Sequence, residues 1–345
     1  MSEIYQKLIR PILFQLAPEQ AHDLTLTALR MVGRSRLLME FIRRMYTAHS
    51  HDITPVSAFG LKFPNPVGLA AGYDKDGIAL RGLSTLGFGH LEIGTVTPRP
   101  QEGNPRPRIF RIPDENALIN RMGFPGQGAD FVCQQLTEVK NRKFPVITGV
   151  NIGKNKDTPN RDAAQDYLEL FFKFSPLADY LTVNVSSPNT IGLRRLQARE
   201  LLEDLLGQLN HARSMIRVYR PILVKISPDL SWDELDDVLE AITRTEMDGI
   251  VATNTTISRE SVNSPMRNQT GGLSGKPLRL RSREMVSEIF RRTGGLMTII
   301  GVGGIMNTDD AKAMLDAGAS LVQIYTGLVF AGPGLVKDIL NQLVG

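Results

Sequence analysis

The chain has 345 residues, 42% of them hydrophobic and 22% charged, which is ordinary for a soluble globular protein with a sizeable core. Its net charge of +4 is too small to indicate nucleic-acid binding, and its single cysteine, Cys133, excludes an internal disulfide and favours a reducing compartment. No apolar run reaches the roughly eighteen residues that a membrane span needs, and the N-terminus lacks the pattern of a signal peptide.

The first 50 or so residues predict two short amphipathic helices, separated around the sequence APEQAH. Ile4, Leu8 and Ile12 fall near one face of the first helix, and basic residues outnumber acidic ones across the segment. Two interpretations fit this pattern: a helical cap packed over the rest of the protein, and a pair of surface helices lying in the headgroup region of an anionic membrane. The pattern by itself favours the cap.

Eight short apolar runs follow from Pro66 onward, each separated from the next by a longer amphipathic or mixed stretch. Near-continuous apolar runs are typical of parallel strands covered on both faces, and the stretches between them suit crossover helices. Eight such repeats over about 280 residues match a (β/α)8 barrel, so we expect a helical segment over 1–50 and a barrel domain over 51–345. The runs cover residues 67–71, 91–95, 146–152, 181–186, 222–227, 249–254, 298–304 and 321–325.

Two of the connecting stretches carry clear helix signals. SWDELDDVLEAITR (231–244) opens with a serine N-cap and an acidic first turn, and NTDDAKAMLDAG (307–318) ends at a glycine. Both therefore predict crossover helices of the barrel.

Polar or glycine residues end all eight predicted strands. Because the active sites of barrels lie at the carboxyl ends of their strands, these eight ends indicate one shared site. The residues concerned are Asp74 and Lys75, Thr95, Asn151, Asn184 to Ser187, Lys225, Thr253 and Asn254, Gly303 and Gly304, and Tyr325 and Thr326.

Glycine-rich sequences in the last third of the chain predict a phosphate site. GVGG (301–304) lacks the third glycine of a dinucleotide fingerprint, and GGLSGK (271–276) is too short for a P-loop. Barrels nevertheless often hold a phosphate with the backbone N–H groups of loops after the seventh and eighth strands. Simple tight turns are the alternative. The residues that could form this cradle are Gly275, Gly303, Gly304, Tyr325 and Thr326.

Two lysines, Lys75 and Lys225, end strands in otherwise apolar surroundings, where a buried ammonium needs a partner or an anionic ligand. Lys75 has Asp74 and Asp76 beside it, so a structural ion pair is an alternative. Lys225 has no carboxylate nearby in sequence before Asp229, which favours a ligand-binding role.

The sequence NVSSPNT (184–190) adds uncharged polar groups at the end of the fourth predicted strand. Carboxamides present paired donors and acceptors, which suit a planar imide or amide heterocycle. A phosphate cradle together with a lysine aimed at a ring suits a flavin.

Metal and hydrolase sites are not expected. The sequence has no G-x-S-x-G elbow, and its histidines are scattered without the spacing of metal ligands. They are His22, His49, His51, His90 and His211.

Nine blocks in sequence order, from about residue 5 to the C-terminus, make the chain resemble one family. The blocks are GLAAGYDKDG, LEIGTVTPRPQEGNPRPRIFR, LINRMGF, VNIGKNKDTP, NVSSPNTIGLR, ATNTT, TGGLSGKPL, IIGVGGI and LVQIYTGLVF. They resemble class 2 dihydroorotate dehydrogenases, quinone-linked FMN-binding barrels that oxidise dihydroorotate to orotate in the biosynthesis of pyrimidines. Another FMN-dependent barrel oxidoreductase of a small substrate, or a non-catalytic membrane-surface module, remains the alternative.

The resemblance implies a role for individual residues. Ser187 matches the catalytic base, which takes a proton from C5 while a hydride passes from C6 to flavin N5; class 1 members use a cysteine, and Cys133 lies in a predicted helix. The flavin would be held by Ala70, Ala71, Gly72, Tyr73, Asp74, Lys75, Thr95, Asn151, Asn184, Lys225, Thr253, Gly275, Gly304, Tyr325 and Thr326. The substrate would be held by Lys75, Asn120, Arg121, Met122, Gly123, Phe124, Asn184, Asn189, Asn254 and Thr255.

The resemblance also gives the N-terminal helices a function, as the mouth through which a membrane quinone reaches the flavin. His22 and Arg111 match the positions that contact the quinone head. The chain starts directly at these helices, which favours a bacterial protein on the cytoplasmic face of the inner membrane. We therefore expect a monomeric peripheral membrane protein with one FMN and no metal.

Overall fold

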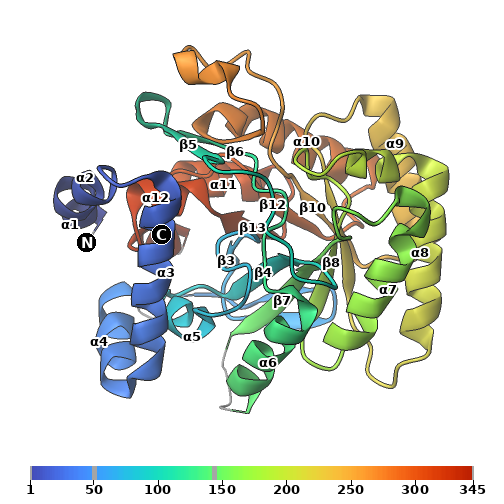
Figure 1. The fold of residues 1–345 in the computed structure, drawn as a ribbon, viewed down its shortest axis with the longest axis horizontal. Coiled ribbons are helices and arrows are strands. Elements are labelled where there is room, and N and C mark those ends of the chain that lie inside the picture. Colours follow the sequence, from blue (N-terminus) through green and yellow to red (C-terminus); the bar gives the residue numbers. More distant parts are fainter. Residues whose placement is uncertain (1, 49–52, 142–145, 344–345) are drawn as a thin grey trace.

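The computed structural model describes residues 2–48, 53–141 and 146–343, and at its centre eight parallel strands close into a barrel (Figure 1). The predicted (β/α)8 barrel is confirmed, because each of the eight apolar runs overlaps one barrel strand. The expected domain boundary after residue 50, and with it His49 and His51, lies outside the described residues. In order around the barrel the strands are β3 (Val67–Leu69), β4 (His90–Val96), β7 (Ile147–Ile152), β8 (Tyr180–Asn184), β9 (Ile222–Ile226), β10 (Gly249–Ala252), β12 (Ile299–Val302) and β13 (Leu321–Ile324), which pairs with β3.

Helices surround the barrel and cover the outer faces of its strands (Figure 1). The predicted Ser231 cap is present, because its hydroxyl accepts from the Glu234 amide at 3.2 Å. The second predicted helix ends just before Gly318, whose φ is +111°, and Asn307, which was not predicted as a cap, accepts from the Asp310 amide. Cys133 lies in a helix, as expected. The helices are α5 (Leu80–Leu83), α6 (Gly128–Lys140), α7 (Ala163–Phe174), α8 (Arg199–Ser214), α9 (Trp232–Arg244), α10 (Arg279–Arg292), α11 (Thr308–Asp316), α12 (Thr326–Ala331) and α13 (Leu335–Leu343).

The N-terminal segment packs on one side of the barrel, at the left of Figure 1. Helical residues lie on both sides of the APEQAH sequence, as predicted: α1 (Ser2–Ile4), the π-helical turn η1 (Tyr5–Ile9) and α2 (Arg10–Leu13) precede it, and α3 (Pro18–Arg34) begins at its proline. A further helix, α4 (Arg36–Tyr46), follows. None of the helices in the described part of the chain combines the length and apolar character needed to cross a membrane.

Specific contacts hold this segment to the barrel domain. The Tyr5 hydroxyl donates to the carbonyl oxygen of Val329 at 2.8 Å, and the Glu19 carboxylate accepts from Arg108 at 2.7 and 3.0 Å. Helix α3 approaches α5 so closely that a Cβ atom on Gly82 would overlap the backbone of Leu29. The segment is therefore a docked cap.

Two small sheets were not predicted from the sequence. The hairpin of β1 (Val56–Ala58) and β2 (Leu61–Phe63) places the Phe63 ring 5.3 Å from the ring of His90. The second sheet joins β5 (Ile109–Ile112) and β6 (Ala117–Asn120) to β11 (Gly272–Gly275), which lies far away in sequence. Strands of three or four residues carry no clear periodicity, and β11 is defined only by its partner. Short 3₁₀ turns complete the fold: η2 (Ser84–Leu86), η3 (Pro113–Glu115), η4 (Asn160–Asp162), η5 (Leu193–Gln197), η6 (Pro265–Asn268) and η7 (Lys276–Leu278).

The interior of the barrel is filled by large side chains that depend on facing glycines. A Cβ atom on Gly149 of β7 would overlap the ring of Tyr180 on β8, and one on Gly68 would overlap the ring of His90. Both rings are fully buried, so neither has space to move away.

We predict that Gly149→Ala lowers the free energy of unfolding by about 2 kcal/mol or more, because the barrel interior would be overpacked. Gly207→Ala is the matched control, because Gly207 lies inside α8 with no heavy atom within 4 Å of the added Cβ. That variant should gain up to about 1 kcal/mol from the helix propensity of alanine. Denaturant unfolding measures both, and equal stability of the two variants would contradict the packing account.

Candidate active site

The carboxyl ends of the barrel strands surround one cavity of about 1120 Å³, including its open mouth. Its wall combines residues from the ends of seven strands with residues of the sheet formed by β5, β6 and β11. The prediction that the strand ends form a shared site therefore agrees with the structure. Predicted site residues in the lining are Ala70, Ala71, Gly72, Lys75, Thr95, Asn120, Met122, Gly123, Phe124, Asn184, Ser187, Asn189, Lys225, Thr253, Asn254, Thr255, Gly275, Gly304, Tyr325 and Thr326.

Four predicted ligand residues lie outside this lining. Tyr73 faces a second cavity, and Asn151 lies below the floor of the first. The Asp74 carboxylate accepts from the amides of Ile78 and Ala79, which fixes the turn after β3. The Arg121 guanidinium donates to Gln269 and to the carbonyl oxygen of Pro107. These contacts are structural, and the ligand-binding roles of the four residues stay predictions.

A buried carboxylate, Glu92, organises the floor of the cavity. It accepts from the Asn151 amide at 2.9 Å, from Gln323 at 2.9 Å and from the Tyr180 hydroxyl at 3.2 Å. Because the NH₂ group of the Asn151 side chain faces Glu92, its carboxamide oxygen points the other way. There it accepts from Thr95 at 2.6 Å and from Asn184 at 3.1 Å. The orientation of the Asn184 carboxamide is thereby fixed as well.

Three parts of this site were not predicted from the sequence: Glu92, Gln323 and Tyr180. One signal was available, because Glu92 is a charged residue in the otherwise apolar run LEIGT. A carboxylate in a buried strand needs hydrogen-bond donors, which points to a polar layer in the barrel.

Lys225 is buried, and Lys75 is partly buried. The Lys75 ammonium donates to the carbonyl oxygen of Gly72 at 3.0 Å, and burial lowers its pKa while Asp76 opposes that shift. Burial also lowers the pKa of Lys225, with the charge of Glu92 acting against it. Within the described residues the Lys225 ammonium makes no hydrogen bond or ion pair, which fits a site for an acceptor group of a ligand.

The turn after β12, Gly303 and Gly304, lines the cavity and packs closely against the start of α10. Gly303 and Gly304 have φ angles of +123° and +74°, and a Cβ atom on Gly304 would overlap the backbone of Arg279. Neither amide donates to an acceptor in the part of the chain that the structure describes. Two free N–H groups facing a cavity are a donor set that suits a phosphate.

Ser187 lies in the segment that follows β8, with its side chain at the wall of the cavity. Its hydroxyl oxygen accepts from the Asn189 amide at 3.2 Å. The Asn189 carboxamide donates to Asn120 at 3.2 Å, which joins this segment to β6. Three predicted substrate-site residues are thus brought together from separate elements.

A second cavity lies between the N-terminal helices and the barrel, and its lining is mostly apolar. It contains His22 and Arg111, as predicted for one site, and shares Ile109, Leu118 and Tyr325 with the first cavity. The rings of His22, Tyr73 and Tyr325 form successive edge contacts at centroid distances of 5.0 and 5.6 Å. Burial and the nearby Lys75 charge lower the pKa of His22 to about 3, so its imidazole is neutral near pH 7.

A closed barrel with a polar cavity at the carboxyl ends of its strands defines a (β/α)8-barrel enzyme. A family model described as dihydroorotate dehydrogenase matches residues 54–345, and the chain belongs to that family.

Relatives named dihydroorotate dehydrogenase (quinone) match nearly the whole chain. That of Roseiflexus sp. (strain RS-1) is 49% identical over 343 residues, covering 99% of this chain and 94% of the relative. That of Yersinia pseudotuberculosis serotype O:1b is 46% identical over 345 residues, covering 99% and 100%. Among solved structures, the enzyme from Eimeria tenella in complex with ferulenol superposes with a TM-score of 0.85 at 36% identity, covering 96% of this chain and 93% of that chain.

Asp74 generates a prediction about pH. Burial raises the pKa of its carboxyl from 3.8 to about 6, against the effect of the backbone amides that it accepts. The folded state therefore holds this proton more tightly than the unfolded chain, and the resulting stability is present below about pH 4 and lost as the pH rises through about 6. The loss is about 3 kcal/mol.

Asp74→Asn has no such proton to lose. We therefore expect the difference in unfolding free energy, wild type minus variant, to fall by about 2 kcal/mol between pH 4 and pH 7. Denaturant unfolding at the two pH values gives this difference, and a value independent of pH would be the contrary result.

Proposed function

We propose that this chain is a quinone-linked dihydroorotate dehydrogenase, which oxidises (S)-dihydroorotate to orotate with FMN and passes the electrons to a membrane quinone. The observation that carries the proposal is the pair of adjoining cavities. One is lined by carboxamides, lysines and free glycine amides, the other is mostly apolar, and Tyr325 belongs to both walls. A polar substrate could thus enter through the first cavity and an apolar acceptor through the second, and both would reach the wall that the two cavities share.

The residues present fit FMN. The amides of Gly303 and Gly304 would hold its phosphate, and Lys225 would donate to the ring, where negative charge develops on reduction. The chemistry that FMN supplies when bound is acceptance of a hydride and its return as electrons to a quinone. The protein binds and orients the reactants and excludes water.

Four carboxamides would bind the pyrimidine ring of the substrate: those of Asn120, Asn184, Asn189 and Asn254. Their paired donors and acceptors match those of a cyclic imide. Lys75 adds a positive charge at the same wall, which suits an anionic substrate.

Ser187 would take the C5 proton of dihydroorotate. Serine is a weak base, so negative charge that develops on its oxygen needs stabilisation as the proton arrives. The backbone amide of Asn189 donates to that oxygen and provides part of this stabilisation. The hydroxyl is buried, which keeps bulk water away from the developing charge.

Residues 1–50 would form the quinone-access and membrane-contact segment, with 51–345 as the catalytic domain. Leu37 and Phe41 of α4 are exposed, and Arg36, Arg43 and Arg44 lie on the same helix. Exposed apolar side chains beside arginines support peripheral binding to an anionic membrane, for which we propose the cytoplasmic face of a bacterial inner membrane. We also propose that the protein is a monomer.

The test of the proposed function is the visible spectrum of FMN-loaded protein before and after anaerobic addition of dihydroorotate. Bleaching of the flavin absorbance is the expected result, and an unchanged spectrum would refute the proposal.

We predict that Ser187→Ala retains FMN but slows this bleaching by about 10²–10⁴-fold, because a positioned base is lost. Near-normal bleaching in a stopped-flow trace would show that Ser187 is not the base.

The apolar cavity generates a separate prediction. Val32→Phe adds bulk to its wall, so we expect quinone reduction to fall at least tenfold while reduction of a soluble dye remains within about twofold. Leu24→Phe on the same helix is the control, because Leu24 is exposed and lies outside the lining. Equal losses with quinone and dye would mean that this cavity is not the quinone route.

A further inference from the structure

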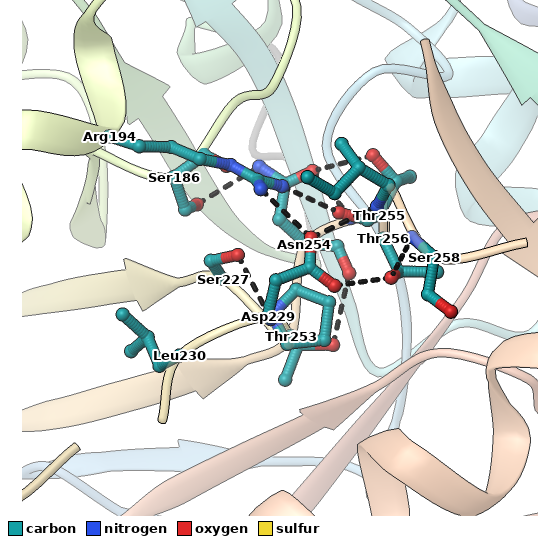
Figure 2. Close-up of polar contacts among 12 residues, drawn as sticks. Ser186, Arg194, Ser227, Asp229, Leu230, Thr253, Asn254, Thr255, Thr256 and Ser258 are labelled. Carbon is teal, nitrogen blue, oxygen red and sulfur yellow. Dashed lines mark hydrogen bonds and ion pairs between the residues drawn. The ribbon is translucent and has the colours of Figure 1, made fainter. Parts of the chain in front are cut away.

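The side chain of Arg194, in η5, joins polypeptide segments that follow two barrel strands (Figure 2). Its Nε donates to the carbonyl oxygen of Ser186 at 3.1 Å, and one Nη donates to the carbonyl oxygen of Thr255 at 3.1 Å. The other Nη donates to the Asp229 carboxylate, in the segment after a third strand, β9, at 2.8 Å. One guanidinium therefore ties together the segments after β8, β9 and β10.

Asp229 completes this connection. Its carboxylate also accepts from the Ile257 amide at 2.9 Å and from the Thr256 hydroxyl, and its own amide donates to Ser227. The side chains of Arg194 and Asp229 are only 23% and 19% exposed. A pair this far removed from water interacts more strongly than a surface ion pair, and its geometry depends on the fork of donors that only arginine provides.

The pair holds backbone groups that lie next to the proposed substrate-site residues. Ser186 directly precedes Ser187 in the chain, and Thr255 directly follows Asn254, so the two carbonyl oxygens lie one residue from proposed substrate-site side chains. The bond from Arg194 to Ser186 also closes the segment 186–194 on itself. Between these ends Ile191 is 88% exposed, whereas Ser187, Thr190 and Leu193 are buried.

Resting on the function proposed above, we propose that Arg194 and Asp229 are positioning residues, which hold Ser187 and the Asn254–Thr255 turn at their places on the cavity wall. Neither side chain lines the cavity. Their effect is on geometry, and a displacement of about 1 Å of a catalytic group can slow a reaction about 10²-fold.

The test compares Arg194→Met with Arg195→Met. Arg195 is the matched control, because its side chain is exposed and makes no hydrogen bond or ion pair with the described residues. Both variants lose one positive charge at adjacent positions. In anaerobic stopped-flow with saturating dihydroorotate, flavin reduction should slow at least tenfold in R194M and stay within about twofold of wild type in R195M.

Four further measurements separate positioning from general damage. Both variants should retain wild-type FMN content and wild-type rates of flavin reoxidation by quinone, because those steps do not use Ser187. Asp229→Asn should reproduce the slow reduction, and the R194M/D229N double variant should be no slower than the slower single variant, since the two residues act as one unit.

Backbone amide hydrogen exchange tests the positioning role in the absence of any substrate. Amides of residues 187–195 should exchange at least tenfold faster in R194M and D229N than in R195M. This readout is independent of whether dihydroorotate is the substrate, so failure of the proposed function would not be confused with failure of the positioning role. Unchanged exchange in R194M and D229N, or flavin reduction within twofold of wild type in both, would overturn it.

Discussion

The buried carboxylate of Glu92 is the constraint on which the polar end of the barrel depends. A carboxylate only accepts hydrogen bonds, so every group packed against it must present a donor. Asn151 therefore turns its amide group to Glu92 and its oxygen to Asn184, and Asn184 in turn presents its oxygen to Ser186 at 3.1 Å and Asn254 at 3.4 Å. One charge on β4 thus sets the direction of hydrogen bonding as far as β10.

The same arrangement leaves donors for a ligand. Lys225 stays buried near the charge of Glu92, yet the carboxylate is already satisfied by Asn151, Gln323 and Tyr180. The ammonium is therefore held ready for an acceptor that the barrel itself does not supply. Tyr325 lines both the polar cavity and the apolar one, so the proposed oxidation of a polar molecule and reduction of an apolar molecule would take place in separate cavities.

Much of the fold could be predicted, because it rests on local patterns. Runs such as VGLAA and TIIGVGG carry apolar residues or glycine on both faces, which is typical of a strand covered on both sides, and Ser231 caps its helix through a residue three positions away. The candidate site could be predicted in part for the same reason: parallel strands of a barrel bring their carboxyl ends together whatever their order in the sequence.

What the sequence by itself determined is therefore the barrel, its helical N-terminal segment and the side chains that follow each strand, since each depends on neighbours along the chain. The tertiary structure alone decided which of those side chains face the cavity: Arg121 turns to Gln269, and Asp74 turns to its own backbone. It also decided the pairing of β6 with β11 and of Arg194 with Asp229, 35 residues apart. Such contacts join residues whose separation in sequence carries no periodic signal, so only the closed barrel brings them together.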